Sequence, residues 1–156
     1  MSDDTPISHL QRRKIEGRVL IPFIEACRTE FGDDATKKVV TATIRGLAAK
    51  DGADWASAFG TDMSSLRRVA EELWAGGGSL DVDIVSQTDE TLSFNVTRCK
   101  YAEFYKNLGL ADIGYLVHCN RDHAMIVGFN TAIELERSQT IMQGAPCYDF
   151  RFRNKS

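Results

Sequence analysis

The most constraining feature of this sequence is a change of hydrophobic period near its middle. Up to residue 76 the apolar side chains recur at helical spacing, whereas over residues 80–84 and 92–96 they alternate with polar residues. Three consecutive glycines, 76–78, separate the two patterns and end any helix that reaches them. The 156 residues therefore predict a helical first half joined to a half that contains β-strands.

The helical half, residues 1–76, predicts three helices with apolar stripes. The first ends at Gly32 and is kinked or divided at Pro22, the second follows directly, and Asp62 caps the third. The stripes expected in the core are Leu20, Phe23, Ile24, Cys27 and Phe31, then Val40, Ile44 and Leu47, then Leu66, Val69, Ala70 and Leu73. The basic cluster over residues 12–14 is expected on a solvated helix face.

The second half, residues 79–153, predicts two hairpins separated by helices. In order, these are a hairpin over 80–84 and 92–96, helices over 101–108 and 121–128, and a hairpin over 133–136 and 147–152. This order indicates an α+β fold with an antiparallel sheet, not a doubly wound parallel sheet. With no internal repeat and no boundary signal, we expect one domain over residues 1–156.

Composition excludes several classes of function. The net charge is −3 with 26% charged residues, whereas proteins that bind nucleic acid or anionic membranes show a basic excess. No apolar run approaches the roughly 20 residues of a membrane span, and the N-terminal residues lack the apolar core of a signal peptide. We therefore expect a cytoplasmic protein whose partner is a small molecule, with homo-oligomerisation left open.

The four cysteines are expected to be reduced thiols. Cys27 lies in an apolar stripe and is assigned to the core, and no pair has the C-x-x-C spacing of a structural zinc site. Cys99 and Cys119 each precede a predicted helix, whose N-terminal N–H groups lower a thiol pKa. A scattered zinc site of Cys99, Cys119, Asp122 and Cys147 stays open as an alternative.

Strand parity and helical spacing suggest which polar groups surround these thiols. Cys99 shares a strand face with Ser93, Asn95 and Thr97, and Cys147 shares one with Asp149 and Arg151. A helical layer over these faces would enclose a polar pocket that contains thiols. Asn120 or Asp122 is expected to cap the helix after Cys119; His123, four positions on, is its expected imidazole partner, and His118 is expected at the surface.

The C-terminal part of the chain resembles the L-2-amino-thiazoline-4-carboxylic acid hydrolase family. The resembling residues are Cys99, Tyr101, Leu108-Gly109, Cys119-Asn120-Arg121-Asp122, Phe129, Arg137, Gln139-Thr140, Gly144, Cys147 and Asp149-Phe150. The final motif departs from the expected Cys-Asp-Phe by one inserted residue, Tyr148.

This resemblance implies a hydrolase that opens a cyclic amidine or amide ring without a cofactor. Asp122 or Glu103 would hold the amidinium and activate water, or Cys119 or Cys99 would attack the ring carbon directly, with His123 nearby. The expected substrate-binding residues are Arg137 as a carboxylate clamp, with Gln139, Thr140, Asn95 and Asp149. Two other functions stay open, a sensor domain that binds a small ligand, metal or haem without chemistry, and a thiol redox sensor.

Overall fold

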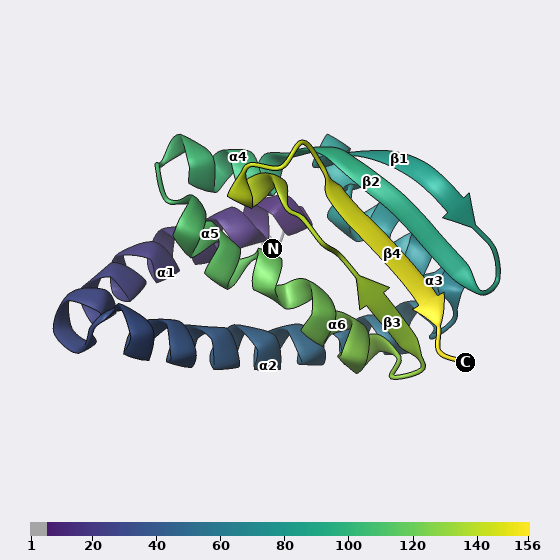
Figure 1. Ribbon diagram of the computed structural model, residues 1–156, viewed down its shortest axis with the longest axis horizontal. Helices are drawn as coiled ribbons and strands as arrows, with labels where there is room; N and C mark the ends of the chain where they lie inside the picture. The colour runs from purple at the N-terminus through teal and green to yellow at the C-terminus, as the bar shows by residue number, and fades with distance from the viewer. Residues whose placement is uncertain (1–5) are drawn as a thin grey trace, which may run out of the picture.

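A four-stranded antiparallel sheet with helices on one face organises residues 6–156, the part of the chain that the computed structural model describes (Figure 1). The helices are α1 (His9–Phe31), α2 (Asp33–Phe59), α3 (Met63–Arg68), α4 (Lys100–Asn107), α5 (Ala111–Val117) and α6 (Asp122–Phe129). The strands are β1 (Leu80–Gln87), β2 (Thr91–Cys99), β3 (Ile133–Glu136) and β4 (Tyr148–Asn154), in the spatial order β1-β2-β4-β3. This arrangement confirms the predicted α+β class and both hairpins.

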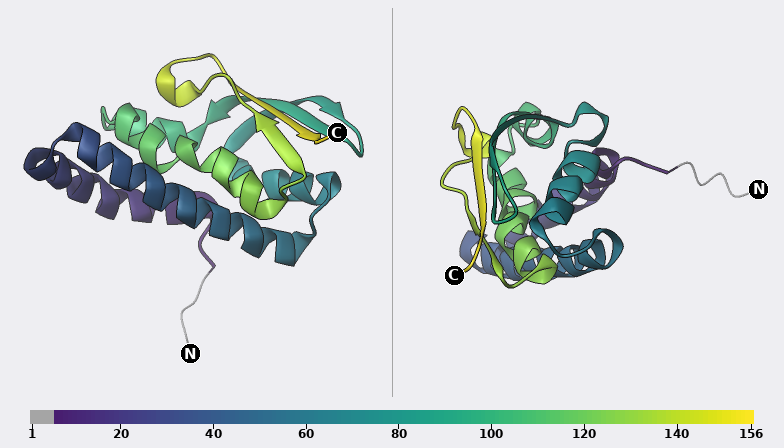
Figure 2. Two further views of the ribbon diagram at one scale, coloured as in Figure 1. Left: turned by 60° about the horizontal axis from the view of Figure 1, so that its bottom comes forward. Right: turned by 90° about the vertical axis from the view of Figure 1, so that its right-hand side faces the viewer.

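The two long helices α1 and α2 form an antiparallel pair on the side of the molecule away from the sheet (Figure 2). Helix α1 runs through Pro22 without being divided, and Gly32 joins it to α2 with a φ of 86°. The predicted stripe of α1 is wrong in part, since Phe23 and Phe31 are each 68% exposed. Ile24 is buried as predicted, and Ile21, which the stripe did not include, is buried too. Apolar side chains occur on both faces of α1, so spacing alone could not identify the buried one.

Similar corrections apply to two other residues assigned to the core. Leu47 of α2 is half exposed, while Ile44 and Ala48 of the same helix are buried. Cys27 is only half-buried rather than a full member of the core. The cap that Asp62 was expected to provide is present, because its carboxylate accepts a hydrogen bond of 2.7 Å from the backbone N–H of Ser65.

Helices α2 and α6 approach each other closely through two glycines. A Cβ on Gly128 would lie 1.9 Å from the carbonyl oxygen of Ala49, and one on Gly52 would lie 2.1 Å from that of Met125. No side chain fits in either place, so both positions require glycine. The contact holds the middle and end of α6 against α2, and the first residue of α6, Asp122, contributes to the candidate site described below.

The inner face of the sheet supplies the aromatic part of the core. Phe94 of β2 pairs with Phe150 of β4, with 5.1 Å between the ring centroids, and Phe152 stacks beyond them. The helices pack against this apolar face, while Asn95 on the opposite face is only half-buried. The predicted pocket on the polar face of the sheet is therefore not formed.

A β-bulge at Thr97 changes the face to which Cys99 points. Asp81 pairs with Arg98, but the next residue, Val82, pairs with Val96, so Thr97 is an extra residue in β2. Thr97 and Arg98 are both exposed, and Cys99 returns to the buried face. The predicted grouping of Cys99 with the polar face of β2 is thus wrong because the alternation shifts by one residue.

Within residues 6–156, none of the helices has both the length and the apolar composition that a membrane span requires.

Candidate functional site

A cavity of about 60 Å³ lies between the inner face of the sheet and the helices. Its polar lining comes from α1 and α2, from the start of α4, from the segment between α5 and α6, and from β4. These polar side chains are His9, Arg13, Asp51, Cys99, Tyr101, His118, Cys119, Arg121, Asp122 and Tyr148. The structure therefore brings together three of the predicted catalytic residues, Cys119, Asp122 and Cys99.

Both cavity thiols are buried, and each has one close polar neighbour. Cys99 is the residue before α4 and its Sγ accepts a hydrogen bond of 3.4 Å from the backbone N–H of Ala102. The Sγ of Cys119 lies 3.4 Å from the hydroxyl of Tyr148. The predicted position of Cys99 at a helix N-terminus is confirmed, but Cys119 begins a short 3-10 turn instead.

The predicted activation of these thiols is wrong. Burial raises the pKa of Cys99 to about 11, and the hydrogen bond from Ala102 offsets only part of that effect. Burial and the charge of Asp122 raise the pKa of Cys119 further still. Burial, then the nearby Cys119, also raises the pKa of Tyr148. At neutral pH all three groups keep their protons, because desolvation disfavours their anions more than the helix start favours them.

Asp122 is the first residue of α6. Among the acidic groups that line the cavity, it has the pKa closest to 7. Its side chain is 21% exposed and accepts a hydrogen bond from Arg137, whose side chain is 5% exposed. Burial raises the pKa of Asp122 to about 6, against the opposing effect of Arg137. Asp122 does not cap α6 through its side chain, and neither does Asn120, so the expected capping role is wrong.

Arg137 holds Asp122 and the turn before α6 together. Its Nη1 donates to the carboxylate of Asp122 and, over 2.8 Å, to the carbonyl oxygen of Cys119. Arg137 does not line the cavity. The structure thus places the predicted carboxylate clamp behind Asp122 rather than beside a substrate.

Two other arginines do line the cavity, and both bind Asp51 of α2. The Asp51 carboxylate accepts hydrogen bonds of 2.9 Å from Arg13 and 2.6 Å from Arg121. Arg13 also donates a hydrogen bond of 2.8 Å to Glu16. Burial, followed by the charges of the two guanidinium groups, lowers the pKa of His9 to about 3. The Arg13 side chain is 10% exposed and its Nε has no hydrogen-bond partner, so its predicted position on a solvated face is wrong.

Aromatic rings form the wall between the arginines and the thiols. The ring of His118 stacks on Tyr101 with 4.6 Å between centroids, and burial lowers the pKa of His118 well below its usual range. Tyr101 donates a hydrogen bond of 3.1 Å to the carbonyl oxygen of Trp74. The predicted surface position of His118 is wrong, because the chain turns between α5 and α6 and directs the ring inward.

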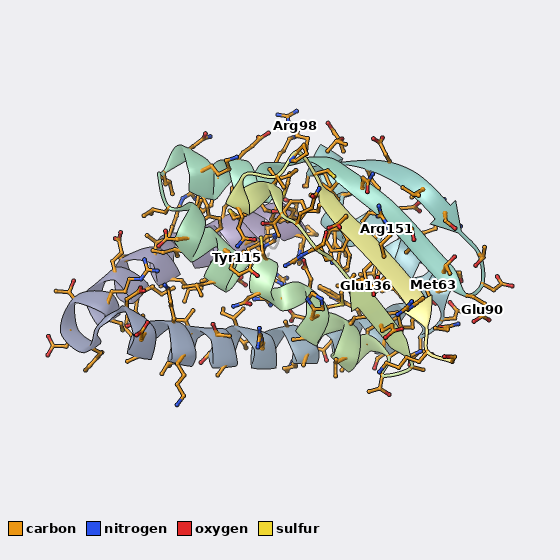
Figure 3. The ribbon with its side chains drawn as sticks, in the orientation of Figure 1. Met63, Glu90, Arg98, Tyr115, Glu136 and Arg151 are labelled. Carbon is orange, nitrogen blue, oxygen red and sulfur yellow. The ribbon has the colours of Figure 1, made fainter. Side chains whose placement is uncertain are left out.

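The remaining predicted catalytic residues lie outside the cavity. Glu103 pairs over 2.7 Å with Arg98, whose side chain points away from the body of the molecule in Figure 3. His123 is exposed on α6, and neither residue lines the cavity. Their predicted roles therefore receive no geometric support.

The other predicted substrate-binding residues make structural contacts elsewhere. Asn95 accepts a hydrogen bond of 2.8 Å from Arg151 on the outer face of the sheet, and Figure 3 shows Arg151 there.

The other three residues contact the segment between β3 and β4. Asp149 accepts hydrogen bonds of 2.9 Å from the backbone of residues 138 and 139. Gln139 donates over 3.1 Å to the Sγ of Cys147. Thr140 is buried and caps the 3-10 turn that follows it. Together these contacts order the segment between β3 and β4.

Metal ligands are not assembled in the part of the chain that the structure describes. No group of three or more His, Cys, Asp and Glu side chains there is arranged to hold a metal ion. Cys147 lies away from the cavity, so the scattered set with Cys99, Cys119 and Asp122 is not formed.

Sequence reasoning missed His9, Asp51, Trp55 and Trp74, which helices far from the cysteines along the chain bring to the cavity. No local pattern marks them. Tyr148 carried one signal, because it is the inserted residue in the Cys147-Tyr148-Asp149-Phe150 segment. That insertion lets Tyr148 point inward on β4 beside Cys119.

Fold and site define an α+β protein with an internal cavity lined by two thiols, two carboxylates and two arginines. A family model for L-2-amino-thiazoline-4-carboxylic acid hydrolase matches residues 12–152, so the chain belongs to this family. The match confirms the resemblance and extends it to the N-terminal helices. No curated protein matches the chain.

One solved structure shares the fold of this chain. It is a trafficking protein particle complex subunit 3 from Naegleria fowleri, covalently bound to palmitic acid. Its TM-score is 0.55 at 11% sequence identity, over 93% of this chain and 96% of that chain. At this identity the similarity establishes a common fold alone.

Proposed function

We propose that the cavity is the active site of a hydrolase that opens a cyclic amidine ring of the amino-thiazoline-carboxylate type. The observation that carries the proposal is the single cavity that unites Asp122, Cys119 and Tyr148 with Arg13 and Arg121. Membership of the hydrolase family supplies the class of reaction. The residues supply an acid–base group, proton donors and a cationic end.

In the proposed reaction, water attacks the ring carbon that is bonded to sulfur and two nitrogens. Asp122 accepts the proton that the water loses and returns it to the leaving ring atom when the tetrahedral intermediate collapses. A C–O bond forms and a ring C–N or C–S bond breaks, so ring plus water gives one open-chain carbamoyl product. A carboxyl group with a pKa of about 6 is mostly deprotonated at neutral pH and suits this role.

The raised pKa values of Cys119 and Tyr148 favour water over a thiolate as the first nucleophile. Attack by Cys119 or Cys99 would first require a proton to leave a thiol that burial keeps protonated. As protonated groups, the Tyr148 hydroxyl and Cys119 thiol instead offer hydrogen-bond donors to the oxyanion that develops on the attacking oxygen.

The substrate carboxylate is proposed to bind at the cationic end of the cavity. Arg13 and Arg121 share Asp51, and Arg13 also pairs with Glu16, which does not line the cavity. The Nε of Arg13 has no partner among the described residues. A charged donor that is buried without a partner is costly, and a substrate carboxylate would satisfy it. Arg13 thus takes the role that the sequence suggested for Arg137.

Substrate entry is proposed to require movement at the rim. The cavity of about 60 Å³ is smaller than the roughly 150 Å³ that holds a benzene ring in an engineered core. Three half-buried rings lie at the rim, those of His9, Trp55 and Trp74. Trp55 meets the other two edge-on, with its ring centroid 5.7 Å from that of His9 and 6.3 Å from that of Trp74. Rotation of these rings would enlarge the cavity without disturbing the sheet.

A hydrolysis assay read by mass spectrometry tests the proposal. The substrates are 2-amino-thiazoline-4-carboxylate and its analogue without the carboxylate, alongside lactams and hydantoins. We expect the carboxylate substrate to gain the mass of one water and the analogue to react far more slowly. Absence of turnover on every ring would refute the proposal.

Binding without chemistry is a second candidate function. It is favoured by the aromatic wall of Trp55, Trp74 and Phe150 and by a fold neighbour whose structure contains palmitic acid. Native mass spectrometry of the purified protein distinguishes the two candidates. A small molecule that co-purifies with the folded protein and is released on unfolding, together with no ring hydrolysis, would favour binding.

A further inference from the structure

The outward face of α1 is apolar although it faces away from the core. Ile15 is 50% exposed, and Val19 and Phe23 are each 68% exposed. Their spacing of four residues places them on one face of α1, opposite the buried Gly17 and Ile21. A helix that is apolar on its solvent side as well as its core side normally has a second partner.

The neighbouring helix extends this apolar surface. Val39 and Leu47 of α2 are 65% and 50% exposed, and α2 lies beside α1 in both views of Figure 2. At about 100 Å² each, the five side chains expose roughly 500 Å², near the top of the range for the largest patch on a monomer. A standard interface takes about 800 Å² from each partner, which this patch and its polar rim can supply.

The order of residues along α1 matches an antiparallel copy of itself. Ile15, Val19, Pro22 and Ala26 are all exposed and follow the alternating spacing of four and three residues that a two-helix seam requires. With α1 antiparallel to the α1 of a second copy, Ile15 faces Ala26 of that copy and Val19 faces its Pro22. The same two contacts then occur twice, as a twofold axis requires.

The charges beside the seam are self-complementary in the same arrangement. Arg18 and Glu25 flank the seam on one side, seven residues apart. Neither forms a salt bridge in residues 6–156, although the Arg18 guanidinium lies 6.0 Å from the centroid of the Phe104 ring of α4. In the antiparallel pair Arg18 lies next to Glu25 of the second copy, and Glu25 next to its Arg18. An unrelated partner would not need this internal symmetry.

We propose that the outward face of α1, extended by α2, is the interface of a symmetric homodimer. Arg13 lines the cavity from the opposite side of α1, so the proposed interface does not include the cavity wall. The proposal stands whether or not the cavity hydrolyses a ring, because it depends on the helix surface alone.

Sedimentation velocity on the full chain over a concentration series tests the proposal. The wild type should sediment as a dimer, and Phe23→Glu should raise the dissociation constant about 30-fold or more, as at an interface hot spot. Val85→Glu is the matched control, since Val85 is 57% exposed on β1 and should leave the dimer intact. Circular dichroism shows whether each variant is folded.

Charge exchange separates a homodimer from any other assembly. Arg18→Glu and Glu25→Arg should each weaken the dimer about 5-fold, because each creates two pairs of like charges. The double variant should regain the wild-type dissociation constant. A monomeric wild type at every concentration, or a double variant that dimerises more weakly than both single variants, would overturn the proposal.

Discussion

Replacing Arg137 by Gln should move the pH dependence of hydrolysis without removing the catalytic group. Arg137 donates to Asp122 and lowers its pKa, while burial raises that pKa to about 6. Without the Arg137 guanidinium, burial is opposed only by the charge of Arg121, and an adjacent arginine typically lowers a carboxyl pKa by about one to three units. The pKa of Asp122 in the variant should therefore rise into the range of about 7 to 9.

The direction in which the pH profile moves follows from the proposed role of Asp122 as a base, because a base must be deprotonated to act. The acid limb of kcat/KM, near pH 6 in the wild type, should move to higher pH in Arg137→Gln. At pH 7 the deprotonated fraction falls from about nine-tenths to between about one-half and one-hundredth, so kcat/KM falls about 2- to 100-fold.

The assay is kcat/KM for 2-amino-thiazoline-4-carboxylate between pH 5 and about 9.5, the span in which Asp122 titrates in either form. Activity of the variant should recover toward the wild-type value at alkaline pH, which a merely misfolded site would not do. Arg153→Gln is the control, since Arg153 pairs with Glu134 on the exposed edge of the sheet and should leave the limb in place. An unmoved acid limb in Arg137→Gln, or a loss with no alkaline recovery, would refute the reasoning.

Three further predictions follow from the same geometry. Arg13→Gln should raise KM for the carboxylate substrate at least 10-fold while hardly changing that for the analogue without the carboxylate, as steady-state kinetics can show. Cys99 and Cys119 should react with iodoacetamide at pH 7 far more slowly in the native protein than after unfolding, and peptide mass mapping that found either rapidly labelled in the native state would contradict the raised pKa values. Gly128→Ala should destabilise the protein by about 2 kcal/mol or more, a fall in Tm of about 4–8 °C, because its Cβ would overlap the carbonyl oxygen of Ala49. An unchanged Tm would show that α6 can move away from α2.

Local signals explain the parts of the fold that could be predicted. The alternating runs that became β1, β2 and β4, the cap at Asp62 and the position of Cys99 before α4 depend on residues adjacent in sequence. The ends of α1 and α4 could also be predicted, because a glycine with positive φ follows each helix, Gly32 after α1 and Gly109 after α4.

Long-range packing explains what could not be predicted. The inward direction of Cys99 depends on one bulge residue, Thr97, which no alternation pattern contains. Arg13 is separated from Asp51 by 38 positions and acquires its role only when α1 and α2 pack together. The thiol pKa values depend on burial, which outweighs the favourable helix start at Cys99.

The most direct test of the central claim is the initial rate of amino-thiazoline-carboxylate hydrolysis by Asp122→Asn, measured beside the wild type and Glu103→Gln. Glu103 is the matched acidic control, because it lies outside the cavity in a surface pair with Arg98. We predict that Asp122→Asn loses at least about 100-fold in kcat, as expected for removal of a general base, while Glu103→Gln retains the wild-type rate. A folded Asp122→Asn variant with the wild-type rate, or a wild type without turnover, would contradict the account.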